Sequence, residues 1–172
     1  DFPPYQEYDI APFPSDYSLE MIAKKLSDGD FIVPDFQRNF VWTIKQSSML
    51  IESFLLGLPV PQAFLYIDRE KKSLVIDGQQ RMLSIRFYLE GYFGEENPNG
   101  KRQVFRLTGL NPKSPYVGKR FEDLDDASQR KLKMATLRVV NIQQLAPDND
   151  STSVYHIFER LNTGGTPLRP QE

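Results

Sequence analysis

The residues best suited to chemistry form one short run, Asp77-Gly78-Gln79-Gln80-Arg81. A glycine between a strand and a helix leaves room for a ligand to approach the backbone, and the first N–H groups of a helix have no partners within it. Such a turn can hold an anion, and Arg81 adds a fixed positive charge there. The residue types and their order therefore predict a phosphate or nucleotide site centred on this run.

Two elements must position the run. The apolar residues 74–76 predict a buried strand, which pairs as a hairpin with a strand at residues 63–67 and so delivers Asp77. After the run, apolar residues recur at helical spacing as far as Gly91: Met82, Leu83, Ile85 and Leu89. The site is thus predicted at a strand-to-helix junction.

A purely structural interpretation explains part of the run. Asp77 would be the N-cap of the helix, Gly78 its first residue, and Gln80 would stand three positions after the cap in a capping pattern. This leaves Gln79 and Arg81 unexplained, because the helix dipole disfavours a cation at that end unless an anion is bound. In the functional interpretation Asp77 would repel phosphate, so its role would be to hold Mg²⁺ or to orient a water.

Two other loops could contribute to the site. Phe36-Gln37-Arg38 is either an ordinary turn with an exposed arginine or a part of the site. The stretch at residues 162–166, NTGGT, is either a glycine cap after Leu161 or a nest of backbone amides that binds an anion. Trp42 and His156 are predicted to be packed side chains.

The rest of the chain alternates helical and strand-like segments. Helices are expected at residues 18–27, 44–56, 125–134 and 151–161, and strands at residues 31–33 and 136–145. The proline-rich residues 1–17 favour an extended arm over a regular element, which leaves residues 18–172 as one domain. Residues 94–120 are expected to form a long, mobile surface excursion with one strand-like island at residues 103–107.

The helix at residues 44–56 has the clearest boundaries. Thr43 and Gln46 fit a capping box, and Gly57 is the expected C-terminal cap. Glu52 lies at the edge of the apolar side and needs a partner, either Arg38 or a bound ligand. The predicted buried residues are Met49, Leu50, Ile51, Phe54 and Leu55.

Composition excludes several classes of site. The formal net charge is −2, from 21 basic and 23 acidic side chains, and gives no support to strong nonspecific nucleic-acid binding. Zero cysteines exclude thiolate chemistry, and a single histidine excludes a two-histidine zinc site or a His-rich nuclease motif. Neither a Walker-type GxxxxGK loop nor GxGxxG is present. Without a long apolar run or a signal peptide, we expect a cytoplasmic protein that does not contact membranes.

Four segments together resemble the N-terminal domain of the GmrSD family of modification-dependent restriction proteins. They are IVPDFQRNFVW at 32–42, LIESFLLGLPVP at 50–61, VIDGQQRMLSI at 75–85 and FERLNTGGTPL at 158–168. They occur in the family's order and span most of the chain. The family is grouped with the ParB and sulfiredoxin-like fold, so the resemblance implies an α/β (α+β) domain with a small mixed sheet and packed helices.

The resemblance also implies a function. DGQQR would be a signature of nucleoside-triphosphate hydrolysis in proteins that defend bacteria by cutting modified phage DNA. In many relatives an HNH-type nuclease domain follows, so this chain is expected to be the N-terminal part of a protein that has a nuclease domain or subunit. DNA cleavage by this chain alone is not expected. The positions that match the family's motifs are Asp77, Gly78, Gln79, Gln80, Arg81, Gln37, Arg38, Asn162, Gly164 and Gly165.

The first hypothesis is an NTP hydrolase that acts as a regulatory module. The backbone of residues 78–81 and the Arg81 side chain would hold phosphates, Asp77 would place Mg²⁺ or water, and Arg38 or Arg160 would neutralise developing charge. Gln79 and Gln80 complete the predicted catalytic group.

Two other hypotheses use the same pocket. In one, it grips a DNA backbone phosphate for binding or nicking, helped by the N-terminal arm, Lys101-Arg102 and Lys119-Arg120. In the other, nucleotide binds without hydrolysis and changes the conformation or the oligomeric state.

Overall fold

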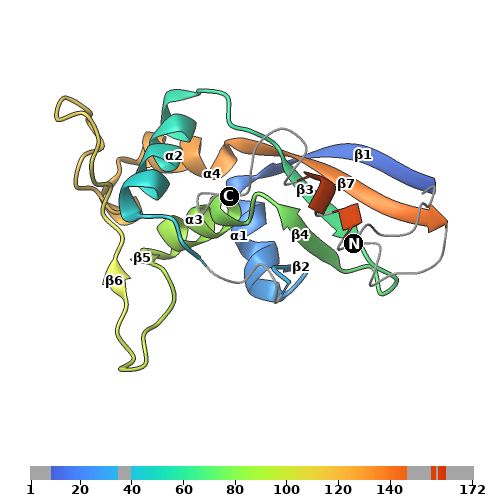
Figure 1. Cartoon of the computed structure of the whole chain (residues 1–172). Helices are drawn as coiled ribbons and strands as arrows, with labels where there is room; N and C mark the ends of the chain where they lie inside the picture. The colour runs from blue at the N-terminus through green and yellow to red at the C-terminus, as the bar shows by residue number, and fades with distance from the viewer. Residues whose placement is uncertain (1–8, 35–39, 147–155, 158, 162–172) are drawn as a thin grey trace.

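The computed structural model describes residues 9–34, 40–146, 156–157 and 159–161, which form an α+β fold on a mixed five-stranded sheet (Figure 1). The strands are β1 Asp9–Ser18, β2 Phe31–Ile32, β3 Ala63–Ile67, β4 Ser73–Asp77 and β7 Thr136–Ala146. Their order in the sheet is β1-β7-β3-β4-β2. The pairs β1–β7 and β3–β4 are antiparallel, whereas β3–β7 and β2–β4 are parallel. The predicted fold class and hairpin are confirmed.

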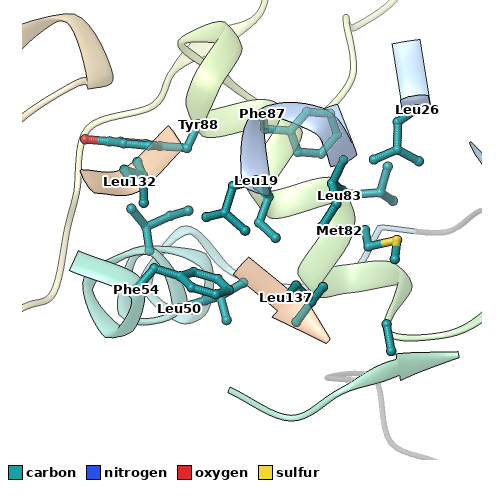
Figure 2. Packing of buried hydrophobic residues seen from close by; sticks show 14 of the residues in the cluster. Leu19, Leu26, Leu50, Phe54, Met82, Leu83, Phe87, Tyr88, Leu132 and Leu137 are labelled. Atoms are coloured by element: carbon teal, nitrogen blue, oxygen red, sulfur yellow. The ribbon is translucent and has the colours of Figure 1, made fainter. Parts of the chain in front are cut away.

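Helices pack their apolar sides on one face of this sheet. They are α1 Leu19–Asp28, α2 Ile44–Leu56, α3 Gln79–Glu90 and α4 Asp126–Met134. Figure 2 shows side chains from all of these helices and from β7 meeting in one cluster. Because side chains alternate along a strand, the other face of the sheet carries its own smaller cluster, in which Ile76 packs with Ile157 of the last helical segment.

The predicted boundaries of α2 are confirmed by its caps. The Gln46 N–H donates to Thr43 Oγ1 at 3.2 Å, and the Thr43 N–H donates to Gln46 Oε1 at 2.8 Å. Gly57 ends the helix in the left-handed conformation, with φ 75°. The predicted helices at residues 18–27 and 125–134 also agree with α1 and α4 to within about a residue at each end. Of the predicted helix at residues 151–161, only 156–157 and 159–161 are described.

The buried side of α2 differs from the prediction at three positions. Met49 is 52% exposed, and Ser47 and Ser48 are buried in its place. Polar side chains can occupy these sites because they are bonded: Ser47 Oγ lies 2.7 Å from Ser84 Oγ on α3, and Ser48 Oγ accepts the Thr108 N–H at 2.9 Å. The buried side of α2 therefore includes the Ser47–Ser84 hydroxyl contact with α3. The spacing of apolar residues in the sequence gives no sign of this polar contact.

Glu52 of α2 bonds to a side chain that was not predicted as its partner. Ser114 Oγ donates to Glu52 Oε2 at 2.7 Å, so a hydroxyl from a distant loop bonds the half-buried carboxylate. Arg38 lies outside the described residues.

The N-terminal segment corrects the prediction of an arm over residues 1–17. Residues 9–18 form β1, which pairs with β7 from Asp9 opposite Ala146 to Ser18 opposite Thr136. Pro12 and Pro14 stand two residues apart on an edge strand, so their missing N–H groups can both face its unpaired side. Residues 1–8 lie outside the described part of the chain.

Residues 94–120 are more firmly anchored than their composition predicts. Strand β6 Gln103–Val104 pairs antiparallel with β5 Tyr92–Phe93, the strand that follows α3. Phe105 and Leu107 are fully buried in the main core. The expectation of a surface excursion is therefore wrong for Phe105 and Leu107, whose side chains anchor the segment in the core, whereas Gln103, Val104 and Arg106 are exposed.

Tyr88 on α3 gives a pH-dependent prediction. Its side chain is fully buried, its hydroxyl donates to the Lys119 carbonyl at 3.2 Å, and burial, followed by the charge of Asp123, raises its pKa from the ordinary value of 10.0. Its contribution to stability is complete below about pH 10 and is lost as pH rises toward the folded-state pKa, because unfolding then releases a proton. We expect urea midpoints of the natural protein to fall more steeply than those of Tyr88→Phe above about pH 10. Parallel curves would contradict this.

Among the described residues, no helix has the length and apolar character needed to cross a membrane. The cytoplasmic location stays a prediction.

Candidate functional site

The predicted strand-to-helix junction is present, but its cap differs from the prediction. Asp77 is the last residue of β4 and pairs with Phe64 of β3, so it is half-buried at the end of the sheet and is not the N-cap residue of the helix. The N-cap is Gly78, with φ 92° and ψ 18°, and α3 begins at Gln79. Glycine has no side chain with which to cap the first turn of α3. The N-cap residue therefore supplies no side-chain acceptor to the first amides of α3, which suits a helix start that binds an anion.

Gly78 is required by close packing as well as by its backbone conformation. A Cβ atom placed on it would lie 2.8 Å from Ala63 Cβ, 3.3 Å from Ala63 Cα and 3.2 Å from Arg81 Nη2. The prediction attributed this glycine to the approach of a ligand. On the side where a Cβ would stand, that space is instead filled by β3 and by the Arg81 guanidinium. The glycine lets α3 start directly against the sheet.

Arg81 is buried at this helix start, with 5% of its surface exposed. Its Nη2 donates to the main-chain carbonyl of Gln62 at 2.9 Å, just before β3 begins. The guanidinium therefore folds back toward the turn at Gly78 and adds its charge to the positive end of the α3 dipole. The hydrogen bond from Arg81 to Gln62 thus holds the guanidinium charge next to the positive end of the α3 dipole.

The two glutamines of the run are also buried, at 0% exposure for Gln79 and 4% for Gln80. Gln80 Oε1 accepts hydrogen bonds from the main-chain N–H groups of Val41, at 2.9 Å, and Trp42, at 3.0 Å. Trp42 is half-buried and packs against the main core, as predicted. This contact brings the segment that follows Gln37 and Arg38 in sequence against the first turn of α3.

The remaining predicted site residues are placed only in part. Gln37, Arg38, Asn162, Gly164 and Gly165 lie outside the described residues. Arg160 is exposed on the last helical segment, whose Ile157 and Leu161 pack on the sheet face that carries Ile76, one residue before Asp77. His156 in the same segment is half-buried.

Arg102 and Arg120, proposed as part of a DNA-contacting surface, are engaged within the protein. Arg102 donates to the Gly94 carbonyl at 2.9 Å and pairs with Glu90 at 3.5 Å. Arg120 pairs with Glu122 at 2.9 Å. Both guanidinium groups also lie over the Tyr92 ring. These contacts hold the β5–β6 hairpin, so they explain both arginines without DNA.

A metal ion at the junction would need donors beyond the side chains that the structure describes. The described residues contain no group of three or more His, Cys, Asp or Glu side chains that could hold one. Asp77 contributes one carboxylate at the junction. Mg²⁺ is commonly held by one or two carboxylates together with phosphate oxygens, so the donor set fits Mg²⁺ only when a nucleotide shares it.

Sequence reasoning missed the main-chain partners of the site. The Gln62 carbonyl and the N–H groups of Val41 and Trp42 carry no side-chain signal. The small side chain of Ala63, at the start of β3, is the one feature that could have indicated a close approach by Gly78.

Comparison with known proteins gives a family. The chain matches the model described as GmrSD restriction endonuclease, N-terminal domain, over residues 19–172. It is also similar to an uncharacterized protein of Methanocaldococcus jannaschii, with 34% identity over 91 residues; the match covers 39% of this chain and 16% of that protein. No solved structure matches, so the grouping with the ParB and sulfiredoxin-like fold stays a prediction. Because the family model covers nearly all of its residues, this chain belongs to the family of GmrSD restriction endonuclease N-terminal domains and is related through it to restriction systems.

Proposed function

We propose that this domain binds a nucleoside triphosphate at the first turn of α3 and hydrolyses it, as the regulatory module of a bacterial restriction system directed against phage DNA. The observation that carries the proposal is the burial of Arg81 beside a helix N-terminus whose N-cap residue, Gly78, is a glycine. A phosphate chain would bring negative charge to the helix dipole and to the guanidinium at once. Family membership supports the link to restriction.

In this proposal the amides at the start of α3 bind phosphate oxygens, and Arg81 donates to the same group. The turn is held in place by the contact of Gly78 with Ala63 and by the bond from Arg81 to Gln62, so its donors need little reorganisation when charge develops. Arg38 and Arg160 are the further cations proposed to neutralise the phosphates, and Asn162, Gly164 and Gly165 the further donors.

Asp77 is proposed to orient the attacking water, or to hold Mg²⁺ together with the nucleotide. When bound, Mg²⁺ would neutralise part of the phosphate charge. The strand pairing of Asp77 with Phe64 fixes its backbone, so its carboxylate would be presented at one end of the sheet without a loop movement. DNA and a nuclease domain or subunit are the proposed partners, and hydrolysis would gate the nuclease.

The test is phosphate release from a panel of the four common NTPs, with and without Mg²⁺, by the natural protein and by Asp77→Asn. We expect the substitution to lower turnover at least about tenfold, because it keeps the side-chain shape but removes the charge that orients water or metal. Asp68→Asn is the matched control, since Asp68 lies at the other end of the β3–β4 hairpin, where its Oδ1 accepts the Lys72 N–H.

The outcomes separate the three functions. Equal turnover in Asp77→Asn would remove Asp77 from the mechanism. Tight nucleotide binding without phosphate release would identify a sensor. Steeply salt-dependent DNA binding, with no NTP bound in calorimetry, would favour the DNA-binding function.

A further inference from the structure

Gln80 joins two segments that are distant in sequence. It lies in the first turn of α3, is 4% exposed, and its Oε1 accepts the N–H groups of Val41 and Trp42 at 2.9 and 3.0 Å. A carboxamide oxygen has two lone pairs, and these two bonds use both of them. The two bonds are part-buried and Gln80 itself is buried, so loss of the oxygen would leave two main-chain donors without this acceptor.

The segment held by Gln80 is fixed at further points along α3. Phe40 packs edge-on against Phe87 of α3, with ring centroids 5.1 Å apart. Thr43, directly after Trp42, caps α2, and Ser47 in the first turn of α2 bonds to Ser84 of α3 at 2.7 Å. Residues 40–47 therefore run along α3 as a strap, and Gln80 is its contact with the turn proposed to bind phosphate.

We propose that Gln80 is a positioning residue that transmits the occupancy of the phosphate site to the main chain at Trp42. The assignment rests on the proposed function and goes beyond it, because it gives Gln80 a role through the strap and not at the reacting atoms. Binding of phosphate draws on the amides of the same turn that carries Gln80. Because Gln80 Oε1 bonds both amides directly, even a small displacement of this anchored turn moves the acceptor of Val41 and Trp42, so the strap and the start of α2 respond to the ligand.

The protein contains its own reporter for this coupling, because Trp42 is the single tryptophan of the chain. Its indole is half-buried against the main core. Tryptophan emission and its quenching by acrylamide therefore report on this one segment.

The experiment compares Gln80→Met, which keeps the length of the side chain but has no strong acceptor, with Gln80→Glu, which keeps an oxygen for both N–H groups. Without ligand, we expect the quenching constant of Trp42 to rise about twofold in Gln80→Met, because the segment opens locally, and to stay near the natural value in Gln80→Glu. The control is Gln129→Met, which removes a glutamine of α4 that also bonds to main chain, at the Leu124 carbonyl before the helix. Circular dichroism checks that each variant is folded.

The second arm adds the NTP and Mg²⁺. We expect nucleotide to change Trp42 emission in the natural protein and in Gln129→Met, and this change to be lost in Gln80→Met, even at ligand concentrations that calorimetry shows to saturate the variant. An unchanged quenching constant in Gln80→Met overturns the assignment, as does an emission change that survives in it. A natural protein that binds no NTP in calorimetry overturns the proposed function and, with it, the transmission of occupancy; the ligand-free quenching then still decides whether Gln80 positions the strap.

Discussion

Replacing Gly78 with alanine is expected to destabilise the fold by roughly 2–6 kcal/mol, through backbone strain and overpacking together. The backbone at residue 78, with φ 92°, has a conformation that L-amino acids rarely adopt. The new methyl would also stand 2.8 Å from Ala63 Cβ and 3.3 Å from Ala63 Cα. Because the second of these atoms belongs to the backbone of β3, relief requires α3 to move away from the sheet. Urea unfolding with linear extrapolation measures the loss.

Gly57→Ala is the matched control. Gly57 is also left-handed, with φ 75°, but no described atom lies within 4 Å of a Cβ built there. It should cost only about 1 kcal/mol, from the strained backbone alone. The difference between the two variants isolates the close approach of α3 to β3. Equal losses in both would show that the contact with Ala63 contributes nothing, and that only the turn conformation requires glycine.

Replacing Arg81 with methionine is expected to lower kcat/KM for NTP hydrolysis by about 10²–10³, the effect of removing one preorganised donor to a developing charge. Methionine keeps the aliphatic volume at a site that is 5% exposed, but it removes the guanidinium that donates to the Gln62 carbonyl. Arg81→Lys should have a kcat/KM between those of the natural protein and Arg81→Met, because lysine keeps the positive charge but lacks the planar guanidinium.

Arg86→Met serves as the control on the same helix. Arg86 pairs with Glu90 at 3.1 Å near the surface, so its loss should leave kcat/KM within about twofold of the natural value. Thermal unfolding of each variant separates lost folding from lost catalysis. A folded Arg81→Met protein with natural kinetics would assign Arg81 to packing against Gln62 alone and would remove the main support for the phosphate site.

The parts of the fold that have local causes were predictable from the sequence. Thr43, Gln46 and Gly57 determine α2, because a capping box satisfies its first amides and glycine accommodates the left-handed turn at its end. The strand-to-helix junction was predicted to within one residue, because an apolar strand, a glycine and a helical stripe follow one another in the sequence. The error in the cap came from the general preference of aspartate for N-cap positions. Here Asp77 instead ends β4, paired with Phe64, and Gly78 is the N-cap.

The contacts between distant segments were not predictable. Nothing local marks the main-chain amides of Val41 and Trp42 as partners of Gln80, and nothing in residues 103–107 tells which apolar side chains enter the core. Prolines disfavour strands in general, so the sequence did not indicate β1. An edge strand tolerates prolines, but β1 is an edge strand only because of the order of strands in the complete sheet.

The place of β7 in the sheet bears on how the protein is made. It lies between β1 and β3, although it is later in sequence than either, so both neighbours leave the ribosome before the strand that joins them. Pairing of strands that are so far apart in sequence is slow, because the entropy cost of closing a long loop precedes the contacts that stabilise the pair. The five-stranded sheet is therefore expected to be completed only after Thr136–Ala146 has been synthesised. Until then, Pro12 and Pro14 would help to keep the waiting first strand from pairing with other chains.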